Sequence, residues 1–490
     1  TAYEIRLSLV GSEMCIRDRL STGVLSNNFW LRPDHDSCGQ KSFTKILADE
    51  GYHTEAIGKM HFIPWDHDEG FVHRVIAEVK RHIHIRDDYA EYLEEHGLRK
   101  LSGPEEPGYH DWKMASISSI PLEHQIDNWI GNKAVEFINS YSHDKPFFLW
   151  VGFAGPHDPY NPPREIADQL KDLVVPESIP ATDESNAFRD SFIKSHLEGS
   201  AQTDFSEFTK ETKDKIRRHY AGLINIIDQQ VGDILKVLDT IPSNRETVVI
   251  FTSDHGIAMP GGKTTVYDPG LRVPFVVRNP YGAKKGVVNN AMISHIDITP
   301  SILDFAGAYN KEEKLPKDGL INFDEAEKRA NNENKGPKIK SFHGRSWIPI
   351  LEKNNPEGWD NIGASHTFHE IQMYYPMRVI RDRNYKLIWN IAYPLPFPFA
   401  SDLWIAPSWQ AQFKQGLEAK YGQKTVKNYN CQARFYYPGK SAGSKRCGRA
   451  LDCPRPALAG HGHDQPWLAG QTPNTKHQTP NTKHLSLIHI

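Results

Sequence analysis

Four segments have apolar patterns that predict regular structure. Residues 43–59 read as a short helix, a glycine turn and a strand. Residues 146–153 and 247–252 are short apolar runs bounded by turn residues, which is typical of strands buried on both faces of a parallel sheet. Residues 213–240 predict the best helix, with an apolar stripe of Ile216, Tyr220, Leu223, Ile224, Ile227, Val231, Ile234, Leu235 and Leu238. Strand, long helix and strand in succession predict an α/β fold with a doubly wound sheet.

The chain divides into regions of different composition and apolar pattern. Residues 20–361 are expected to form the main domain, with a charged, Asn-rich surface insertion or long loop at 308–340. Residues 377–389 predict two short strands around a polar turn, so we place a small C-terminal domain at 362–430. Residues 431–484 are rich in Gly, Pro, Lys and Arg and contain a tandem repeat, which predicts a frameshift or a disordered tail.

The two ends are expected to lie outside the natural reading frame. Residues 1–19 match the translation of sequencing-adapter DNA, and residues 485–490 match its reverse complement. We therefore exclude both segments from the expected fold as adapter artefacts. Cys15 and Arg17 then have no assigned role, and no signal peptide can be read.

Composition narrows the class of protein. The chain has 490 residues, of which 38% are hydrophobic and 24% charged, so a large core is expected and wholesale disorder is not. A net charge of −3 argues against a dedicated nucleic-acid binder. The sequence has no apolar run of about 18 residues, so no transmembrane helix is expected. Its 5 cysteines form no CxxC pair, which argues against a disulfide framework or a zinc ribbon.

Charged and imidazole side chains gather directly after three predicted strands. They are Lys59, His61, His157, Asp254, His255 and Lys263. Taken singly, each is also typical of a turn or of a solvated surface. Ligand crevices in open α/β sheets lie beyond the carboxyl ends of the strands, so their joint position indicates one site.

The residue types in these clusters indicate a site for an oxyanion. The Asp254 carboxylate offers oxygen ligands for a hard divalent metal. Lys59 and Lys263 could neutralise a tetrahedral anion. His61 and His157 could donate to that anion, or act as general acids toward a leaving group.

The sequence around the clusters resembles the sulfatase family of the alkaline phosphatase superfamily. Six segments occur in the family's order: GYHTEAIGKMHF, PFFLWVGFAGPHDPYNPP, HYAGLINIIDQQVGDIL, VVIFTSDHGIAMPGGKTTVYDPGLRVPFVV, SHIDITPSILDFAG and GRSWIPIL. The resemblance covers about residues 20–425. Within it, SHTFHEIQMYYPMRVIRDRNYKLIWN and PFPFASDLWIAPSWQ are similar to heparan N-sulfatase and bacterial arylsulfatase-like proteins. The implied fold is an alkaline-phosphatase-like doubly wound sheet with helices on both faces, plus a small C-terminal α+β domain with an antiparallel sheet.

The resemblance implies a metal-dependent hydrolase of sulfate esters or sulfamates, acting on sulfated carbohydrates or aryl sulfates. Asp254 and His255 would be metal ligands. The residues that would contact the sulfate or the leaving group are Lys59, His61, His157 and Lys263. The residues that would lie near the substrate sugar are His369, Glu370 and Arg378, although a hairpin with ordinary surface polar residues explains these three equally well.

The identity of the metal depends on position 255. This chain has His255 where many sulfatases have Asn, whose carbonyl suits calcium, whereas imidazole favours softer metals. We expect Ca²⁺, with Mn²⁺ or Mg²⁺ as alternatives.

The chain departs from the family pattern at the nucleophile. Sulfatases carry a Cys-x-Pro-Ser-Arg motif, whose Cys becomes formylglycine. Only Thr22 and Gly23, which normally follow this motif, are present, and counting back places the Cys at Glu13 in the adapter segment. The formylglycine, the motif Arg and an upstream Asp pair are therefore expected in the parent protein but absent here, along with a central strand of the sheet. We predict that the chain as written is inactive.

Two other functions remain open at this stage. One is a phosphodiester or phosphonate monoester hydrolase of the same superfamily, and the other is a pseudoenzyme; the residue before Pro-Ser-Arg in the upstream gene would distinguish them. The expected partner is a sulfated small molecule or glycan, with no nucleic acid or membrane, and the oligomeric state is open. The sequence has no Asn-x-Ser/Thr sequon, which favours a bacterial origin, and the family then suggests a periplasmic or secreted location.

Overall fold

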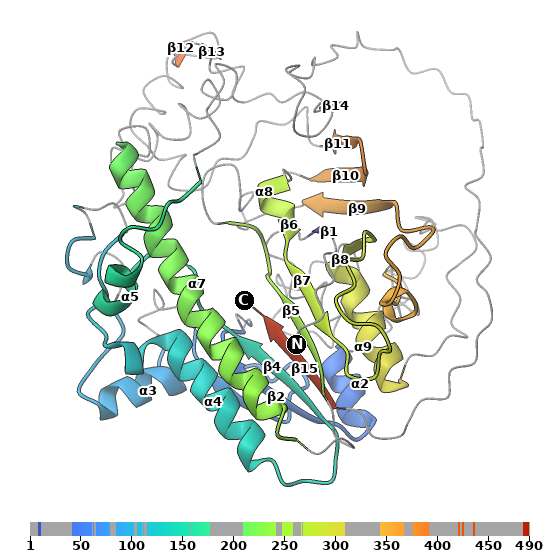
Figure 1. The fold of residues 1–490 in the computed structure, drawn as a ribbon, viewed down its shortest axis with the longest axis horizontal. Coiled ribbons are helices and arrows are strands. Elements are labelled where there is room, and N and C mark those ends of the chain that lie inside the picture. Colours follow the sequence, from blue (N-terminus) through green and yellow to red (C-terminus); the bar gives the residue numbers. More distant parts are fainter. Residues whose placement is uncertain are drawn as a thin grey trace, which may run out of the picture.

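The computed structural model places most of the predicted main domain (Figure 1). It describes residues 42–60, 62, 65–78, 85–101, 105–109, 111, 115–157, 159–176, 209–241, 247–257, 266, 268–308, 344–366 and 376–391. Beyond these it gives the course of short strands at 8–10, 420–421, 424–425, 435–436 and 484–489.

A six-stranded sheet forms the centre of the molecule, in the order β3-β2-β4-β15-β5-β7. Its strands are β2 (His53–Gly58), β3 (His73–Ile76), β4 (Phe147–Gly152), β5 (Thr247–Thr252), β7 (Phe275–Arg278) and β15 (His484–His489). Neighbouring strands are parallel except for β7, which runs antiparallel to β5. The three strands expected from apolar patterns are confirmed, and nearly all residues of β2, β4 and β5 are buried.

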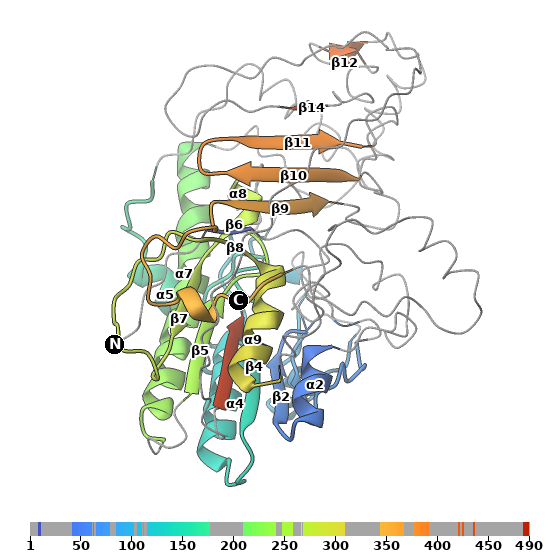
Figure 2. The same cartoon turned by 90° about the vertical axis from the view of Figure 1, so that its right-hand side faces the viewer.

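Helices cover both faces of this sheet (Figures 1 and 2). Helices α4 (Ile126–Ser140) and α7 (Lys210–Leu238) pack on one face, and α2 (Phe43–Asp49) and α9 (Ile298–Ala306) on the other. Successive side chains of a strand point to opposite faces. Accordingly, Phe148 of β4 joins the core under α2 and α9, whereas Leu149 and Val151 join the core under α4 and α7. The doubly wound sheet is therefore confirmed.

The long helix α7 matches its prediction in extent but not at every position of its stripe. Its N-terminus is capped by Thr209, whose hydroxyl oxygen accepts a hydrogen bond from the Thr212 amide at 3.1 Å. Ile224 was placed on the buried stripe, but its side chain is 44% exposed, whereas Ile226 is 2% exposed. His219 is also buried, at 6% exposed. The packing of two helices and the sheet, rather than apolarity alone, decides which side chains face inward.

A second, antiparallel sheet has the order β14-β11-β10-β9. Its strands are β9 (Asn361–His366), β10 (Met377–Asp382), β11 (Lys386–Asn390) and β14 (Phe435–Tyr436). The predicted hairpin is confirmed as β10 and β11. Its turn is closed by Asp382, whose carboxylate accepts the amides of Asn384 at 2.7 Å and Tyr385 at 2.5 Å.

Shorter elements complete the described fold. The helical ones are α3 (Asp88–Glu95), η4 (Leu122–His124), α5 (Arg164–Gln169), α8 (Asp268–Leu271), η6 (His295–Asp297) and η7 (Ile348–Ile350). The strands are β1 (Ser8–Val10), β6 (Arg272–Val273) and β8 (Met292–Ser294), which form a small sheet, and the pair β12 (Lys420–Tyr421) and β13 (Lys424–Thr425). Across the described ranges, no helix is both long and apolar enough to cross a bilayer.

The end segments, which we left out of the expected fold, carry strands in this structure. Strand β15 lies between β4 and β5, at the level of the central sheet, and β1 lies between β6 and β8. Strand β14 likewise falls in the stretch expected to be a disordered tail. The physical reason is that β4 and β5 present backbone donors and acceptors that any extended segment can satisfy, whatever the origin of its sequence. That residues 1–19 and 485–490 derive from adapter DNA stays a prediction.

Candidate active site

Four of the predicted site residues lie at one edge of the central sheet. Lys59 follows β2, His157 lies in the loop after β4, and Asp254 and His255 follow β5. The three strands run in the same direction, with β15 between β4 and β5. Their carboxyl ends therefore share an edge, which is where open α/β sheets bind ligands.

Two glycines set the position of Lys59 against the end of β4. The Lys59 amide donates to the carbonyl oxygen of Gly152 at 2.7 Å. A Cβ on Gly58 would lie 2.1 Å from Gly152 O, and a Cβ on Gly152 would lie 2.1 Å from Lys59 O. Gly58 also has φ +99°, a region that favours glycine. Close backbone approach thus holds Lys59 beside the exit of the neighbouring strand.

The chain after Lys59 is fixed by buried carboxylates. The amide of Met60 donates to Glu78 Oε1 at 3.3 Å, and the amide of Glu78 donates to Asp87 Oδ2 at 2.6 Å. Asp87 also pairs with Lys100 at 2.5 Å, with side chains that are 0% and 3% exposed. These contacts join the end of β2 to the end of β3 and the start of α3. This arrangement could not be predicted from the sequence, because each carboxylate is typical of an ordinary surface residue.

Asp254 and His255 form a compact pair of possible metal ligands. The Asp254 Oδ1 accepts the backbone amide of His255 at 2.9 Å, and Asp254 Oδ2 lies 3.4 Å from His255 Nε2. His255 Nδ1 lies 2.7 Å from the carbonyl oxygen of Gly256, which requires that Nδ1 carry the proton. Nε2 of the imidazole then faces the Asp254 carboxylate.

The turn that carries this pair is held from two sides. The Ser253 hydroxyl donates to His255 O at 2.9 Å, and His295 Nε2 donates to Ser253 O at 2.9 Å. His295 is 1% exposed. On the other side, the Gly256 amide donates to Gly270 O at 2.9 Å. Helices η6 and α8 thus support the turn after β5.

The donor set fits part of a divalent metal site. A carboxylate oxygen and an imidazole nitrogen on adjacent residues suit a hard or borderline cation. Among the residues that the structure describes, however, no group of three or more His, Cys, Asp or Glu side chains is arranged to hold a metal. Asp254 and His255 would therefore supply two ligands, and further ligands would have to come from elsewhere.

Tyr220 of α7 lies close enough to Asp254 for the carboxylate charge to affect the pKa of its hydroxyl. Burial raises the pKa of Tyr220 to about 12, and the Asp254 carboxylate adds to this effect. The ring also packs edge-on against Tyr160, at 5.8 Å between centroids. The apolar stripe identified Tyr220 as a core residue and gave no sign of its proximity to the site.

The other predicted site residues are not brought into this group by the described part of the chain. His61, Lys263, His369 and Glu370 lie outside the described residues. Arg378 is half-buried on β10, where its guanidinium donates to the carbonyl oxygen of Met377 at 3.0 Å. Figure 2 shows the second sheet beyond the carboxyl end of β15, on the same side as the strand exits.

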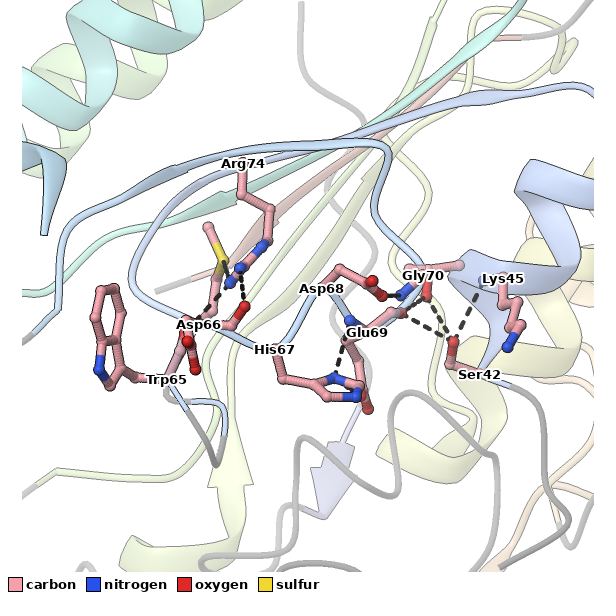
Figure 3. A network of polar contacts seen from close by, with 11 residues as sticks. Ser42, Lys45, Trp65, Asp66, His67, Asp68, Glu69, Gly70 and Arg74 are labelled. Atoms are coloured by element: carbon pink, nitrogen blue, oxygen red, sulfur yellow. Dashed lines mark hydrogen bonds and ion pairs between the residues drawn. The ribbon is translucent and has the colours of Figure 1, made fainter. Parts of the chain in front are cut away.

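A cavity of about 450 Å³ lies beside the edge strand β3 rather than at the strand exits. In its wall, the Arg74 guanidinium donates to Asp66 O at 2.6 Å and to Trp65 O at 3.3 Å (Figure 3). Its lining residues are Trp65, Asp66, Asp68, Phe71, Val72, His73, Arg74, Ile76, Arg86, Asp87, Asp88 and Glu91. None of the strand-exit residues is among them. The chemistry-bearing residues, and not this cavity, therefore identify the candidate site.

Comparison with known proteins identifies the family of this chain. The chain matches the family model described as Sulfatase over residues 14–308. N-sulphoglucosamine sulphohydrolase of Homo sapiens is 34% identical over 185 residues, which is 38% of this chain and 33% of that protein. An arylsulfatase of Clostridium perfringens is 29% identical over 415 residues, covering 76% of each chain. This chain thus spans a third of the length of the human relative and about three quarters of the clostridial one.

A solved structure shows the same fold. The phosphonate monoester hydrolase from Silicibacter pomeroyi superposes with a TM-score of 0.57 at 17% sequence identity, covering 79% of this chain and 80% of that chain. At this low sequence identity, the structural similarity supports the mixed α/β fold and nothing further. Because the family model covers more than half of the residues, the chain belongs to the sulfatase family.

Proposed function

We propose that the strand exits of β2, β4 and β5 form the sulfate site of a hydrolase that cleaves sulfate esters or sulfamates. One observation carries the proposal: in a chain of the sulfatase family, three parallel strands bring Lys59, His157 and the Asp254–His255 pair to one edge. The names of the relatives, a sulphohydrolase of N-sulphoglucosamine and an arylsulfatase, support sulfated sugars or aryl sulfates as the substrate class.

Each residue at the edge has a role that follows from its chemistry. Lys59 supplies positive charge to the sulfate oxygens, and His157 donates a hydrogen bond or a proton to the oxygen that leaves. Asp254 and His255 would hold a divalent cation, for which we favour Ca²⁺ over Mn²⁺ or Mg²⁺; when bound, it supplies further positive charge to the anion. His61 and Lys263 are proposed to act with His157 and Lys59.

We further propose that this chain binds the anion without turning it over. The formylglycine of the family would supply the nucleophile, and the residues matching its motif are not in this sequence. We also propose Arg378 of β10, together with His369 and Glu370, as contacts of the sugar. Arg378 belongs to β10, and Figure 2 shows this strand's sheet beyond the carboxyl end of β15, which supports the proposal for Arg378.

Titration of the full chain with inorganic sulfate tests the anion site. We expect Lys59→Ala and His157→Ala each to weaken sulfate binding about tenfold in calorimetry, the size of one lost charge-assisted hydrogen bond. Lys236→Ala is the matched control, because Lys236 is 78% exposed on α7 and pairs only with Asp233 on its own helix in the contacts seen. Equal binding by all variants would contradict the proposal.

The reading frame upstream of Leu20 tests the reaction. Cys or Ser followed by x-Pro-Ser-Arg would support a sulfatase, and the extended protein should release sulfate from an aryl sulfate. Because the phosphonate monoester hydrolase shares the fold, a phosphodiester or phosphonate monoester hydrolase is the second candidate. A Thr at that position, with turnover of a phosphonate monoester and none of the aryl sulfate, would favour it. A frame with no nucleophile would indicate a pseudoenzyme.

A further inference from the structure

We propose that Asp127 is a positioning residue that fixes the loop carrying His157. Asp127 lies in the first turn of α4 and is 3% exposed. Its Oδ1 accepts the backbone amides of Ala154 at 2.8 Å and Gly155 at 2.9 Å. These two residues lie between the end of β4 and His157. A helix on one face of the sheet thus holds the exit of the strand that carries a site residue.

The contact is built to hold a charged carboxylate in one place. Two backbone N–H groups donate to the same oxygen, and the N-terminal turn of a helix favours a negative side chain. A Cβ on Gly155 would lie 2.5 Å from Asp127 Oδ2 and 3.3 Å from Ile227 Cδ1. Glycine at position 155 therefore permits the approach of the carboxylate, and any larger residue would push it away.

The chain on the far side of His157 is held as well. His219 Nδ1 lies 3.1 Å from the carbonyl oxygen of Tyr160, to which it donates, and Asn161 Nδ2 donates to Glu106 Oε1 at 2.7 Å. Asn161 and Glu106 are 2% and 4% exposed. With the loop anchored before and after His157, its imidazole keeps its place at the sheet edge. The inference rests on the proposed function only in taking His157 as a sulfate contact.

Three variants of the full chain test this role. Asp127→Ala removes the acceptor, Asp127→Asn keeps one carbonyl oxygen for the two amides, and Gly155→Ala displaces the carboxylate while leaving Asp127 in place. Asp233→Ala is the control, because this carboxylate is 49% exposed and pairs with Lys236 on the surface of α7. Gly155→Ala also keeps the test decisive if Asp127→Ala does not fold.

We expect the amide protons of Ala154 and Gly155 to exchange about 100-fold faster in Asp127→Ala and Gly155→Ala, with little change in Asp127→Asn. Sulfate affinity should fall about tenfold in the first two variants and less than about threefold in Asp127→Asn. In a His157→Ala background, Asp127→Ala should weaken sulfate binding no further, since it acts through His157.

Two results would overturn the inference. One is unchanged exchange at Ala154 and Gly155 in Asp127→Ala. The other is an equal loss of sulfate affinity with and without His157, which would mean that Asp127 only stabilises the fold. If the unaltered chain bound no sulfate, the proposed function alone would fail, because exchange and an NMR titration of the His157 imidazole still report the position of the loop. The midpoint pH of that titration should shift in Asp127→Ala and return to the value of the unaltered chain in Asp127→Asn.

Discussion

The central sheet and the antiparallel sheet are buried in different ways, and their sequences differ accordingly. Strands β2, β4 and β5 are buried on both faces. β4 and β5 consist mostly of apolar side chains, whereas β2 also buries Thr54 and Glu55. In the antiparallel sheet only one face packs inward. Val379 and Ile388 are 6% and 4% exposed, whereas their neighbours Ile380 and Leu387 are 57% and 37% exposed.

This difference decides which residues a sequence can assign. In strands buried on both faces, charged residues are expected mainly at the strand ends, and Lys59 and Asp254 follow this expectation. Glu55 within β2 is an exception, and it pairs with His53 and His73. In the antiparallel sheet both faces carry apolar residues, so the pattern does not show which face is buried. The buried face belongs to a small apolar core, which we call the seam. It consists of Val266, Leu271, Met292, Ile362, Ala364, Val379 and Ile388.

The largest effect is expected from removing β15, because it joins the two halves of the central sheet. Deletion of residues 484–490 leaves β4 and β5 without the strand that pairs with both. We expect loss of the cooperative thermal transition and aggregation in size-exclusion chromatography, since two strand edges become unpaired. Ser486→Thr, which keeps the backbone pairing, is the control. An unchanged melting temperature after the deletion would show that β15 does not complete the sheet.

Sequence reasoning found the parts of the fold that depend on local pattern and missed those that depend on distant partners. Short apolar runs located β4 and β5, and the strand exits located Lys59, His157 and Asp254. Asp127 was missed, because its buried role depends on Ala154 and Gly155, which are distant in sequence. A carboxylate early in a helix ordinarily reads as a solvated residue. The inclusion of β15 could not be predicted either, because pairing with β4 and β5 uses backbone groups that carry no sequence signal.

Truncating a side chain of β11 should lower the free energy of unfolding strongly only on the face of the strand that packs into the seam. Ile388→Ala removes a side chain that is 4% exposed in the seam, and we expect a loss of about 2–5 kcal/mol in the free energy of unfolding. Leu387→Ala, on the outward face, is the matched control and should cost less than about 1 kcal/mol. Urea denaturation measures both, and equal losses would mean that the outward face is also covered.

A buried carboxylate in the main domain should make stability fall as pH rises from about 4 to 6. Asp297 accepts the amides of Ser294 and Arg345, each at 2.8 Å, but burial dominates and raises its pKa to about 6. In the unfolded chain the pKa is about 3.9, so between these values the folded state binds the extra proton. The free energy of unfolding should decrease across this window by about 1–3 kcal/mol and then level off.

Asp297→Asn should remove this decrease, because the amide does not titrate. Urea denaturation at several pH values measures the slope, and Asp233→Asn at an exposed site serves as the control. If Asp297→Asn retained the full slope between pH 4 and 6, another group would have to be responsible.

The smallest effect, and the one of opposite pH dependence, is expected at the ion pairs of Asp268 in α8 with Arg381 and Lys386 of the antiparallel sheet. Burial alone would raise the pKa of Asp268, but the charges of Lys386 and Arg381 outweigh it and hold the pKa below its ordinary value. Asp268 Oδ1 lies 3.1 Å from Lys386 Nζ and 2.5 Å from Arg381 Nη1. A carboxyl with a depressed pKa contributes stability above its unfolded value of about 3.9 and loses it as pH falls through the folded pKa.

Asp268→Asn should therefore lower the free energy of unfolding by about 1 kcal/mol at neutral pH, because the side chain is 44% exposed and solvent screens the pair. The difference from the unaltered chain should shrink as the pH falls below about 4, where Asp268 is protonated in both states. Asp360→Asn is the control, since Asp360 pairs with Arg383 at 2.7 Å on the surface of the same sheet. A difference that stayed constant down to pH 3 would mean that Asp268 joins the two regions by shape and hydrogen bonding, and that its charge contributes nothing.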